Sequence, residues 1–255
     1  MNQASNAINI PNTVEAPKLI AHRGLAVGVP ENSLQSFIMA GEARFWAIET
    51  DIHETKDGIL VCNHDATVDR MYTCSGLISG MTYDELMTLT ICHEEHDATP
   101  VEMLKMPTFR QYLEICKRYG ALPFIEVKSG SLAKIIEQAG AYFSTDQIII
   151  SSTNQAMLYE ARKVSNEVFL HHIFSKRSMM LQLSELGNCG VSYNYPDYRD
   201  CPIDLRKETR GAGVLLCLRA GDKPEIVRNM VDFELDYIPT NCVTPADVYA
   251  SLGKD

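Results

Sequence analysis

The chain has 255 residues with 33 acidic and 23 basic side chains, which gives a formal net charge of −10. This acidity argues against a nucleic-acid partner and against a protein held by charge on an anionic membrane. No apolar run approaches the ~20 residues that a membrane-spanning helix needs. The 8 cysteines are scattered without a C-x-x-C pair, and residues 1–17 lack the apolar core of a signal peptide. We therefore expect a cytoplasmic protein with free thiols and no stable membrane insertion.

Short apolar runs alternate with segments of helical spacing along the whole chain. Eight of these runs are expected to be strands: residues 18–22, 46–53, 122–128, 147–152, 168–174, 190–194, 213–218 and 236–240. The expected helix N-caps between them are Asn32 or Ser33, Thr108, Ser131, Asn154, Ser175 and Thr244. Eight strand–helix units predict an α/β fold whose parallel sheet closes into a (β/α)8 TIM barrel, with an open doubly wound sheet as the alternative.

The second unit departs from this regular pattern. The Asp-Gly pair at 57–58 lies between two apolar runs and is typical of a hairpin turn, so residues 59–64 should fold back along residues 48–53. Residues 65–106 then form an insertion, and insertions in such barrels usually lie at the catalytic, carboxyl-terminal face. Because no linker divides the sequence, we expect residues 1–255 to form one barrel domain that carries this insertion.

Three carboxylates are predicted to lie together near the ends of neighbouring strands. Side chains two apart in a strand point the same way, so Glu49 and Asp51 share one face and Glu126 shares a face with Lys128. Carboxylates that point into a barrel are costly to bury without a cation. Three hard oxygen ligands suit Mg²⁺ or Ca²⁺. The alternative is a set of salt-bridged barrel residues, with Lys128 neutralising Glu126, but the three-way arrangement favours a metal site.

Two histidines are predicted to reach the same region. His22 ends the first strand beside Arg23, and the hairpin returns His64 to the second strand. Two imidazoles near a divalent cation can divide the work of general base and general acid, while Arg23 and Lys128 can hold a phosphate. A single histidine at a strand end is more often structural. Together with the carboxylates, however, the set indicates metal-assisted cleavage of a phosphate ester.

A series of short motifs runs in a fixed order through residues 18–128. They are His-Arg-Gly at 22–24, Pro-Glu-Asn-Ser at 30–33, Ile-Glu-Thr-Asp at 48–51, Thr-Lys-Asp-Gly at 55–58, Asn-His-Asp at 63–65, Pro-Thr-Phe at 107–109 and Ile-Glu-Val-Lys at 125–128. His-Arg-Gly alone is a weak signal, but the ordered set is highly specific. It resembles the glycerophosphodiester phosphodiesterase family, whose fold is a (β/α)8 barrel.

The resemblance implies a reaction and a role for each matching residue. Members of the family hydrolyse a glycerophosphodiester to sn-glycerol 3-phosphate and an alcohol, typically with Mg²⁺ or Ca²⁺. Position by position, the resemblance assigns acid–base catalysis to His22 and His64, phosphate binding to Arg23 and Lys128, and metal binding to Glu49, Asp51 and Glu126. Two points stay open, namely whether water or a glycerol hydroxyl attacks the phosphorus, and which histidine begins as the base.

The second half of the chain departs from the family pattern. The usual Trp-Thr-Val-Asn of the seventh strand is absent, and residues 214–219 read Val-Leu-Leu-Cys-Leu-Arg. The closing Thr-Asp-x-Pro appears as Thr-Asn-Cys at 240–242. Because of these changes, the sequence does not identify the alcohol group of the substrate. Arg219 is a candidate contact for an anionic leaving group.

The sequence leaves two functions open as alternatives to hydrolysis of a glycerophosphodiester. The first is a phospholipase D-like lyase or lysophospholipase that releases a cyclic phosphate, which would need an exposed apolar lip on the insertion. The second is a non-catalytic member that binds phosphodiesters, which is disfavoured because no ligand or histidine is missing. In each case the expected partner is a small-molecule phosphodiester, and the oligomeric state stays open.

Overall fold

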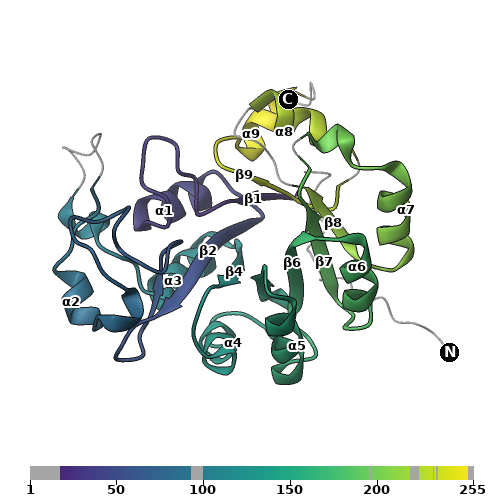
Figure 1. The fold of residues 1–255 in the computed structure, drawn as a ribbon. Coiled ribbons are helices and arrows are strands. Elements are labelled where there is room, and N and C mark those ends of the chain that lie inside the picture. Colours follow the sequence, from purple (N-terminus) through teal and green to yellow (C-terminus); the bar gives the residue numbers. More distant parts are fainter. Residues whose placement is uncertain are drawn as a thin grey trace.

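A computed structural model describes residues 18–92, 100–195, 197–218, 224–231, 233 and 235–251 (Figure 1). Its parallel strands are β1 (Leu19–Ala21), β2 (Ala47–Glu54), β4 (Leu122–Val127), β5 (Ile149–Ser152), β6 (Phe169–Ser175), β7 (Cys189–Tyr193), β8 (Leu215–Leu218) and β9 (Ile238–Thr240). They are hydrogen-bonded in the order β8-β7-β6-β5-β4-β2-β1-β9. A parallel bridge from Cys217 to Tyr237 then brings β8 beside the start of β9. The eight strands therefore form a nearly closed barrel, which confirms the predicted TIM barrel over the open sheet.

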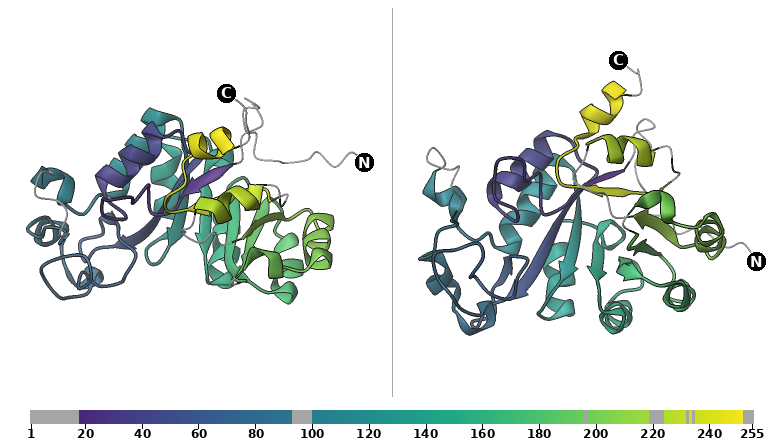
Figure 2. Two further views of the ribbon diagram at one scale, coloured as in Figure 1. Left: turned by 90° about the horizontal axis from the view of Figure 1, so that it is seen from above. Right: turned by 45° about the horizontal axis from the view of Figure 1, so that its top comes forward.

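Helices follow the strands and cover the outside of the barrel (Figure 2). They are α1 (Leu34–Glu42), α3 (Phe109–Tyr119), α4 (Leu132–Gly140), α5 (Gln155–Val164), α6 (Arg177–Ser184), α7 (Ile203–Gly211), α8 (Pro224–Val231) and α9 (Pro245–Ser251). None of the described helices is both long enough and apolar enough to cross a membrane. The side chains of Ser33, Thr108, Ser131 and Asn154 accept hydrogen bonds from the first turns of their helices, as predicted.

One predicted cap is wrong. Helix α6 begins after Lys176 rather than after Ser175, and Lys176 makes no capping bond with its side chain. Ser175 is still part of β6, where it pairs with Tyr193 of β7. Strand β6 thus includes a residue type that, in isolation, would favour a helix start.

The apolar residues form separate layers inside and outside the barrel. Ile48, Ile52 and Ile125 point outward and pack against the helices. Ile20, Phe124 and Phe169 point inward and fill the barrel with Tyr237 and Cys217. This alternation is the two-residue period of a strand, and it places the next inward positions of β2 and β4 at the carboxyl end of the barrel.

The insertion packs as a unit of its own at one side of the barrel (Figure 2). Strand β3 (Leu60–Cys62) runs antiparallel to β2 with Ile52 opposite Cys62, which confirms the predicted hairpin. Beyond it lie the short helices η1 (Ile78–Gly80), α2 (Tyr83–Met87) and η2 (Val101–Leu104). Their buried side chains form one cluster: Val61, Val68, Tyr72, Ile78, Leu86, Ile91, Leu104 and Met106. The segment that follows His64 is therefore anchored by a small core of its own.

Candidate active site

A pocket of about 300 Å³ opens at the carboxyl ends of the barrel strands. Its polar side is formed by residues from β1, β2, β4 and the hairpin, and we call it the charged wall: His22, Arg23, Glu49, His64, Glu126 and Lys128. Asp51 completes this wall from just beneath the pocket surface, where its side chain is 1% exposed. All seven residues that the sequence predicted for the site therefore lie together.

The three carboxylates converge as the strand parity predicted. Asp51 of β2 lies opposite Glu126 of β4, and Glu49 lies two residues before Asp51 on the same face. One oxygen from each carboxylate lies within 4.8 Å of the others, and all three side chains are buried. Asp51 Oδ1 is buried, and the cation it contacts is Lys128, whose Nζ lies 3.1 Å away. Three buried hard oxygen ligands at this spacing fit a divalent cation.

The electrostatics of this cluster also fit a cation. Burial raises the pKa of Glu49 well above its usual range, and the neighbouring Asp51 and Glu126 carboxylates raise it further. The pKa of Glu126 is raised by burial and by Asp51. Burial opposes ionisation of Asp51 as well, but Lys128 and Arg23 outweigh it and lower the pKa of that carboxyl. The cluster thus carries like charges in a buried place, which a bound cation would stabilise.

The loop after β1 directs Arg23 toward the carboxylates. Arg23 and Gly24 have left-handed backbone φ values of 56° and 80°, and a Cβ at Gly24 would collide with Ser36 of α1. This turn aims the backbone N–H of Arg23 at Glu49 Oε2, to which it donates at 2.7 Å. The chemistry of the His-Arg-Gly motif therefore includes a backbone donor as well as two side chains.

Both cations of the charged wall contact the carboxylates. Lys128 Nζ lies 2.6 Å from Glu126 Oε1 and 3.1 Å from Asp51 Oδ1. Arg23 Nε lies 3.5 Å from Asp51 Oδ2, and its Nη1 donates to Glu31 at 3.0 Å. Both cations lie beside the carboxylate cluster, where an anionic phosphate would meet positive charge.

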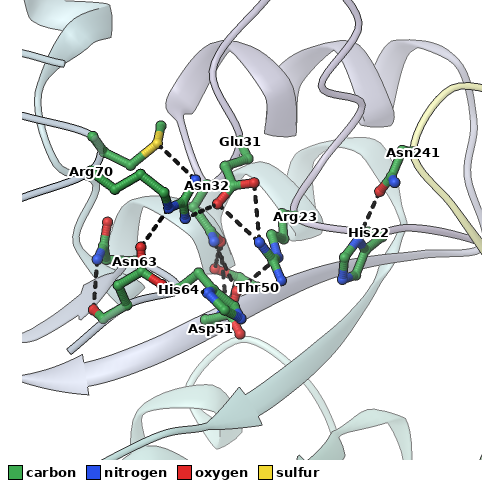
Figure 3. A network of polar contacts seen from close by, with 12 residues as sticks. His22, Arg23, Glu31, Asn32, Thr50, Asp51, Asn63, His64, Arg70 and Asn241 are labelled. Atoms are coloured by element: carbon green, nitrogen blue, oxygen red, sulfur yellow. Dashed lines mark hydrogen bonds and ion pairs between the residues drawn. The ribbon is translucent and has the colours of Figure 1, made fainter. Parts of the chain in front are cut away.

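The two catalytic candidates differ in the group that holds the Nδ1 atom of the ring (Figure 3). His22 Nδ1 lies 2.7 Å from the amide oxygen of Asn241, whereas His64 Nδ1 lies 2.8 Å from the carboxylate of Asp65. Burial and the nearby Arg23 lower the pKa of His22. Sequence reasoning did not assign a role to Asn241 or Asp65, although both belong to the quoted motifs.

Two other polar residues lie behind the charged wall. Asn32 donates to Asp51 Oδ2 at 2.9 Å and accepts from Thr50 Oγ1 at 2.8 Å, so it fixes the orientation of the central carboxylate. His53 is buried and lies 3.3 Å from the backbone carbonyl of His64. His53 therefore supports the hairpin rather than facing the pocket. Its contact could not be foreseen from strand parity, because it depends on the return path of the chain.

The remaining lining is mostly apolar, and we call it the apolar wall: Ile20, Phe124, Ile173, Phe174, Cys217 and Pro239. Strand β8 contributes Cys217 to this wall and lacks the tryptophan that the seventh strand of the family usually carries. Phe174 of β6 supplies an aromatic ring at the pocket instead, and it is 46% exposed with a left-handed φ of 57°. A register shift between His172 and Ser175 turns it toward the pocket. Arg219, the candidate contact for an anionic group, lies outside the described residues.

His171 points into the barrel beneath the apolar wall, where it also lines the pocket, and the next residue, His172, points outward. His171 Nδ1 lies 2.5 Å from the Tyr237 hydroxyl, and its ring packs against Phe124. Burial, together with His172, lowers the pKa of His171 to about 3. The low pKa keeps this buried ring neutral near pH 7, although His171 also lines the pocket.

Comparison with known proteins agrees with this geometry. Residues 22–203 match the Glycerophosphoryl diester phosphodiesterase family. A glycerophosphodiester phosphodiesterase from Caldanaerobacter subterraneus subsp. tengcongensis is 33% identical over 241 residues, which cover 88% of this chain and 93% of that protein. Among solved structures, a glycerophosphodiester phosphodiesterase from Parabacteroides distasonis is 25% identical, with a TM-score of 0.74 and coverage of 92% of this chain and 96% of that one.

A second solved structure is similar in fold. It is an Oleispira antarctica phosphodiesterase in complex with the product sn-glycerol-3-phosphate, with a TM-score of 0.81, 22% identity, and coverage of 93% of this chain and 97% of that one. The family match spans most of the barrel, and the Caldanaerobacter relative spans nearly the whole chain. The chain therefore belongs to the glycerophosphoryl diester phosphodiesterase family.

Proposed function

We propose that this protein hydrolyses a glycerophosphodiester to sn-glycerol 3-phosphate and an alcohol with the help of a divalent cation. The observation that carries the proposal is the charged wall, in which three buried carboxylates, two histidines and two cations meet in one pocket. The product bound to the Oleispira antarctica phosphodiesterase supports the same product class here. Residues 1–255 are proposed to act as one barrel domain in the cytoplasm, on a small diester rather than on intact bilayer lipid.

Glu49, Asp51 and Glu126 would hold the cation. When bound, Mg²⁺ or Ca²⁺ would offset the negative charge of the phosphate and lower the pKa of a hydroxyl or water beside it. The donor set is made only of carboxylate oxygens, which suits these hard ions better than it suits zinc.

Arg23 and Lys128 would bind the non-bridging oxygens of the phosphate. Both side chains are about one-fifth exposed at the edge of the carboxylate cluster, so their charges are partly shielded from water. With a net charge of −10 for the whole chain, long-range attraction of an anionic substrate is weak, and the local positive charge must provide it. As negative charge accumulates on the phosphorus substituents in the transition state, these contacts would strengthen.

His22 is proposed as the general base and His64 as the general acid of the first step. The Asn241 amide oxygen accepts from His22 Nδ1–H, which leaves Nε2 free to take a proton from the attacking hydroxyl or water. The lowered pKa of His22 keeps that ring neutral near pH 7. The Asp65 carboxylate instead holds His64 Nδ1 at 2.8 Å, which orients the ring so that its other nitrogen can donate to the departing oxygen.

The cyclic-phosphate route is the second candidate, and one observation favours it. That route requires an exposed apolar lip on the insertion, and Leu77 and Val101 are 57% and 54% exposed there. If these side chains meet an acyl chain, the substrate is a lysolipid and attack by a glycerol hydroxyl would yield a cyclic phosphate. The two reactions are distinguished by their products: hydrolysis yields sn-glycerol 3-phosphate, whereas the second route yields a cyclic phosphate.

The test is phosphorus NMR of reactions with glycerophosphocholine, glycerophosphoethanolamine, glycerophosphoglycerol, glycerophosphoinositol and a lysophosphatidylcholine. Each is incubated with protein in EDTA, Mg²⁺ or Ca²⁺. The proposal predicts sn-glycerol 3-phosphate from at least one glycerophosphodiester, and only with metal. Accumulation of a cyclic phosphate from the lysolipid alone would favour the second candidate. No turnover of any diester by folded, metal-loaded protein would overturn both.

A further inference from the structure

Arg70, in the insertion, bridges two carboxylates at the edge of the charged wall (Figure 3). Its Nε donates to Asp65 Oδ2 at 2.5 Å, and its Nη2 donates to Glu31 Oε1 at 2.6 Å. The planar guanidinium holds both partners at fixed angles, which a single ammonium group does not do. Asp65 and Glu31 come from different loops, so Arg70 fixes the position of one loop relative to the other.

Each of these carboxylates in turn contacts a residue of the charged wall. Asp65 uses its other oxygen, Oδ1, to hold His64 Nδ1 at 2.8 Å. Glu31 accepts from Arg23 Nη1 through both of its oxygens, at 3.0 and 3.1 Å. Arg70 therefore lies at the centre of a continuous chain of hydrogen bonds, which runs from the candidate acid, His64, to the candidate phosphate ligand, Arg23.

The backbone around Arg70 is well anchored, although its side chain is half exposed. Val68 and Tyr72 flank it in the chain and are buried in the core of the insertion, at 0% and 5% exposure. The Tyr72 N–H donates to the Val68 carbonyl at 2.9 Å and closes a tight turn around Arg70. Because the backbone at Arg70 is anchored in the insertion, the guanidinium holds Asp65 and Glu31 at positions that the insertion determines.

We propose that Arg70 is a positioning residue that acts through Asp65 and Glu31 to orient the His64 imidazole and the Arg23 guanidinium. This inference rests on the proposed function of His64 and Arg23. Arg70 is not among the residues that line the pocket, so the proposed effect passes through Asp65 and Glu31. Partly exposed ion pairs contribute little to stability, so the role is expected in catalysis rather than in folding.

The chain provides a matched control for this inference. Arg177 also bridges two carboxylates on the surface, with Nε 2.6 Å from Glu208 Oε2 and Nη2 3.0 Å from Asp204 Oδ2. Its exposure of 54% is close to the 47% of Arg70. Arg177 lies on α6 and is not among the lining residues of the pocket, so Arg177→Met removes the same kind of contact without reaching the charged wall.

The experiment compares Arg70→Met, Arg70→Lys and Arg177→Met with the wild type in the metal-loaded protein. Arg70→Met should lower kcat/KM by about tenfold or more, since a catalytic group displaced by a fraction of an ångström loses this much. Arg70→Lys keeps the charge without the planar fork and should stay impaired, whereas Arg177→Met should match the wild type. Thermal melting of all three should stay close to that of the wild type.

Nitrogen NMR of the histidine rings gives a second readout that needs no turnover. The His64 signals, assigned through His64→Gln, should change in both Arg70 variants and stay unchanged in Arg177→Met. Wild-type kcat/KM in Arg70→Met, full rescue by lysine or unchanged His64 signals would each overturn the inference. If the wild type turns over no diester, the proposed function fails, and the ring signals alone decide whether Arg70 orients His64.

Discussion

The two walls of the pocket are built in different ways. The charged wall comes from residues 22–128, and almost every polar group in it is held by another: Asp51 by Asn32, His64 by Asp65, and Arg23 by Glu31. The apolar wall comes mainly from β6, β8 and β9 and is held by packing. From this difference we propose that the charged wall holds the reacting groups in a fixed geometry, while the apolar wall sets the shape of the space for the substrate.

The largest effect is expected from the histidines of the charged wall. His22→Ala and His64→Ala should each lower kcat by about 100-fold or more, because each removes a proton-transfer group. A diester with a 4-nitrophenol leaving group needs no acid, so it should restore much of the activity of His64→Ala but not that of His22→Ala. Steady-state kinetics with both substrates checks this prediction. Equal rescue of the two variants would refute the proposed division of roles.

The next largest effect should come from the carboxylates. Glu49→Gln and Glu126→Gln should weaken metal binding, measured by calorimetry, and excess Mg²⁺ should partly restore their turnover. Glu54→Gln is the matched control, because Glu54 is on the same strand but pairs with Lys134 at 2.7 Å. Metal affinity that is unchanged in both site variants would show that these residues are not the ligands.

Beneath the apolar wall, His171 should make stability depend on pH. The folded protein protonates this ring near pH 3, whereas an unfolded histidine does so near 6.5. The unfolded state therefore binds more protons between these values, and stability should fall by about 1.4 kcal/mol for each pH unit below about 6.5. Urea unfolding from pH 7 to 4.5 measures this slope. His171→Gln should make this slope shallower, although His22, whose pKa is also lowered, still contributes. Tyr237→Phe, which keeps the histidine, should not make it shallower; an equal slope in His171→Gln and the wild type would contradict the assignment.

The smallest effect is expected at Phe174. Removal of its exposed ring in Phe174→Ala should raise KM by roughly three- to tenfold for diesters with bulky alcohol groups, since about half of an aromatic contact is lost. The kcat value should change little, because Phe174 has no group that can transfer a proton or bind a metal. Leu181→Ala, an exposed apolar residue on α6, is the control and should leave KM unchanged. A loss of kcat without a change in KM would assign Phe174 to the chemical step.

The sequence predicted the barrel and the convergence of seven candidate residues because both depend largely on short-range regularities. Strand parity alone places Glu49 and Asp51 on one face, and the Asp-Gly turn alone returns His64 to β2. The contacts of Arg70 with Glu31 and of Asn241 with His22 join residues 39 and 219 positions apart in the chain. No local pattern encodes such pairs. The orientation of Phe174 toward the pocket could likewise not be predicted from the sequence, because it follows from a register shift between two strands.

We propose above all that the three carboxylates of the charged wall serve a metal-dependent cleavage of glycerophosphodiesters. The most direct measurement is release of sn-glycerol 3-phosphate from glycerophosphoethanolamine by protein stripped with EDTA, before and after Mg²⁺ or Ca²⁺ is restored. We expect no release from the stripped protein and full release after metal is added. Undiminished release from stripped, metal-free protein would contradict it.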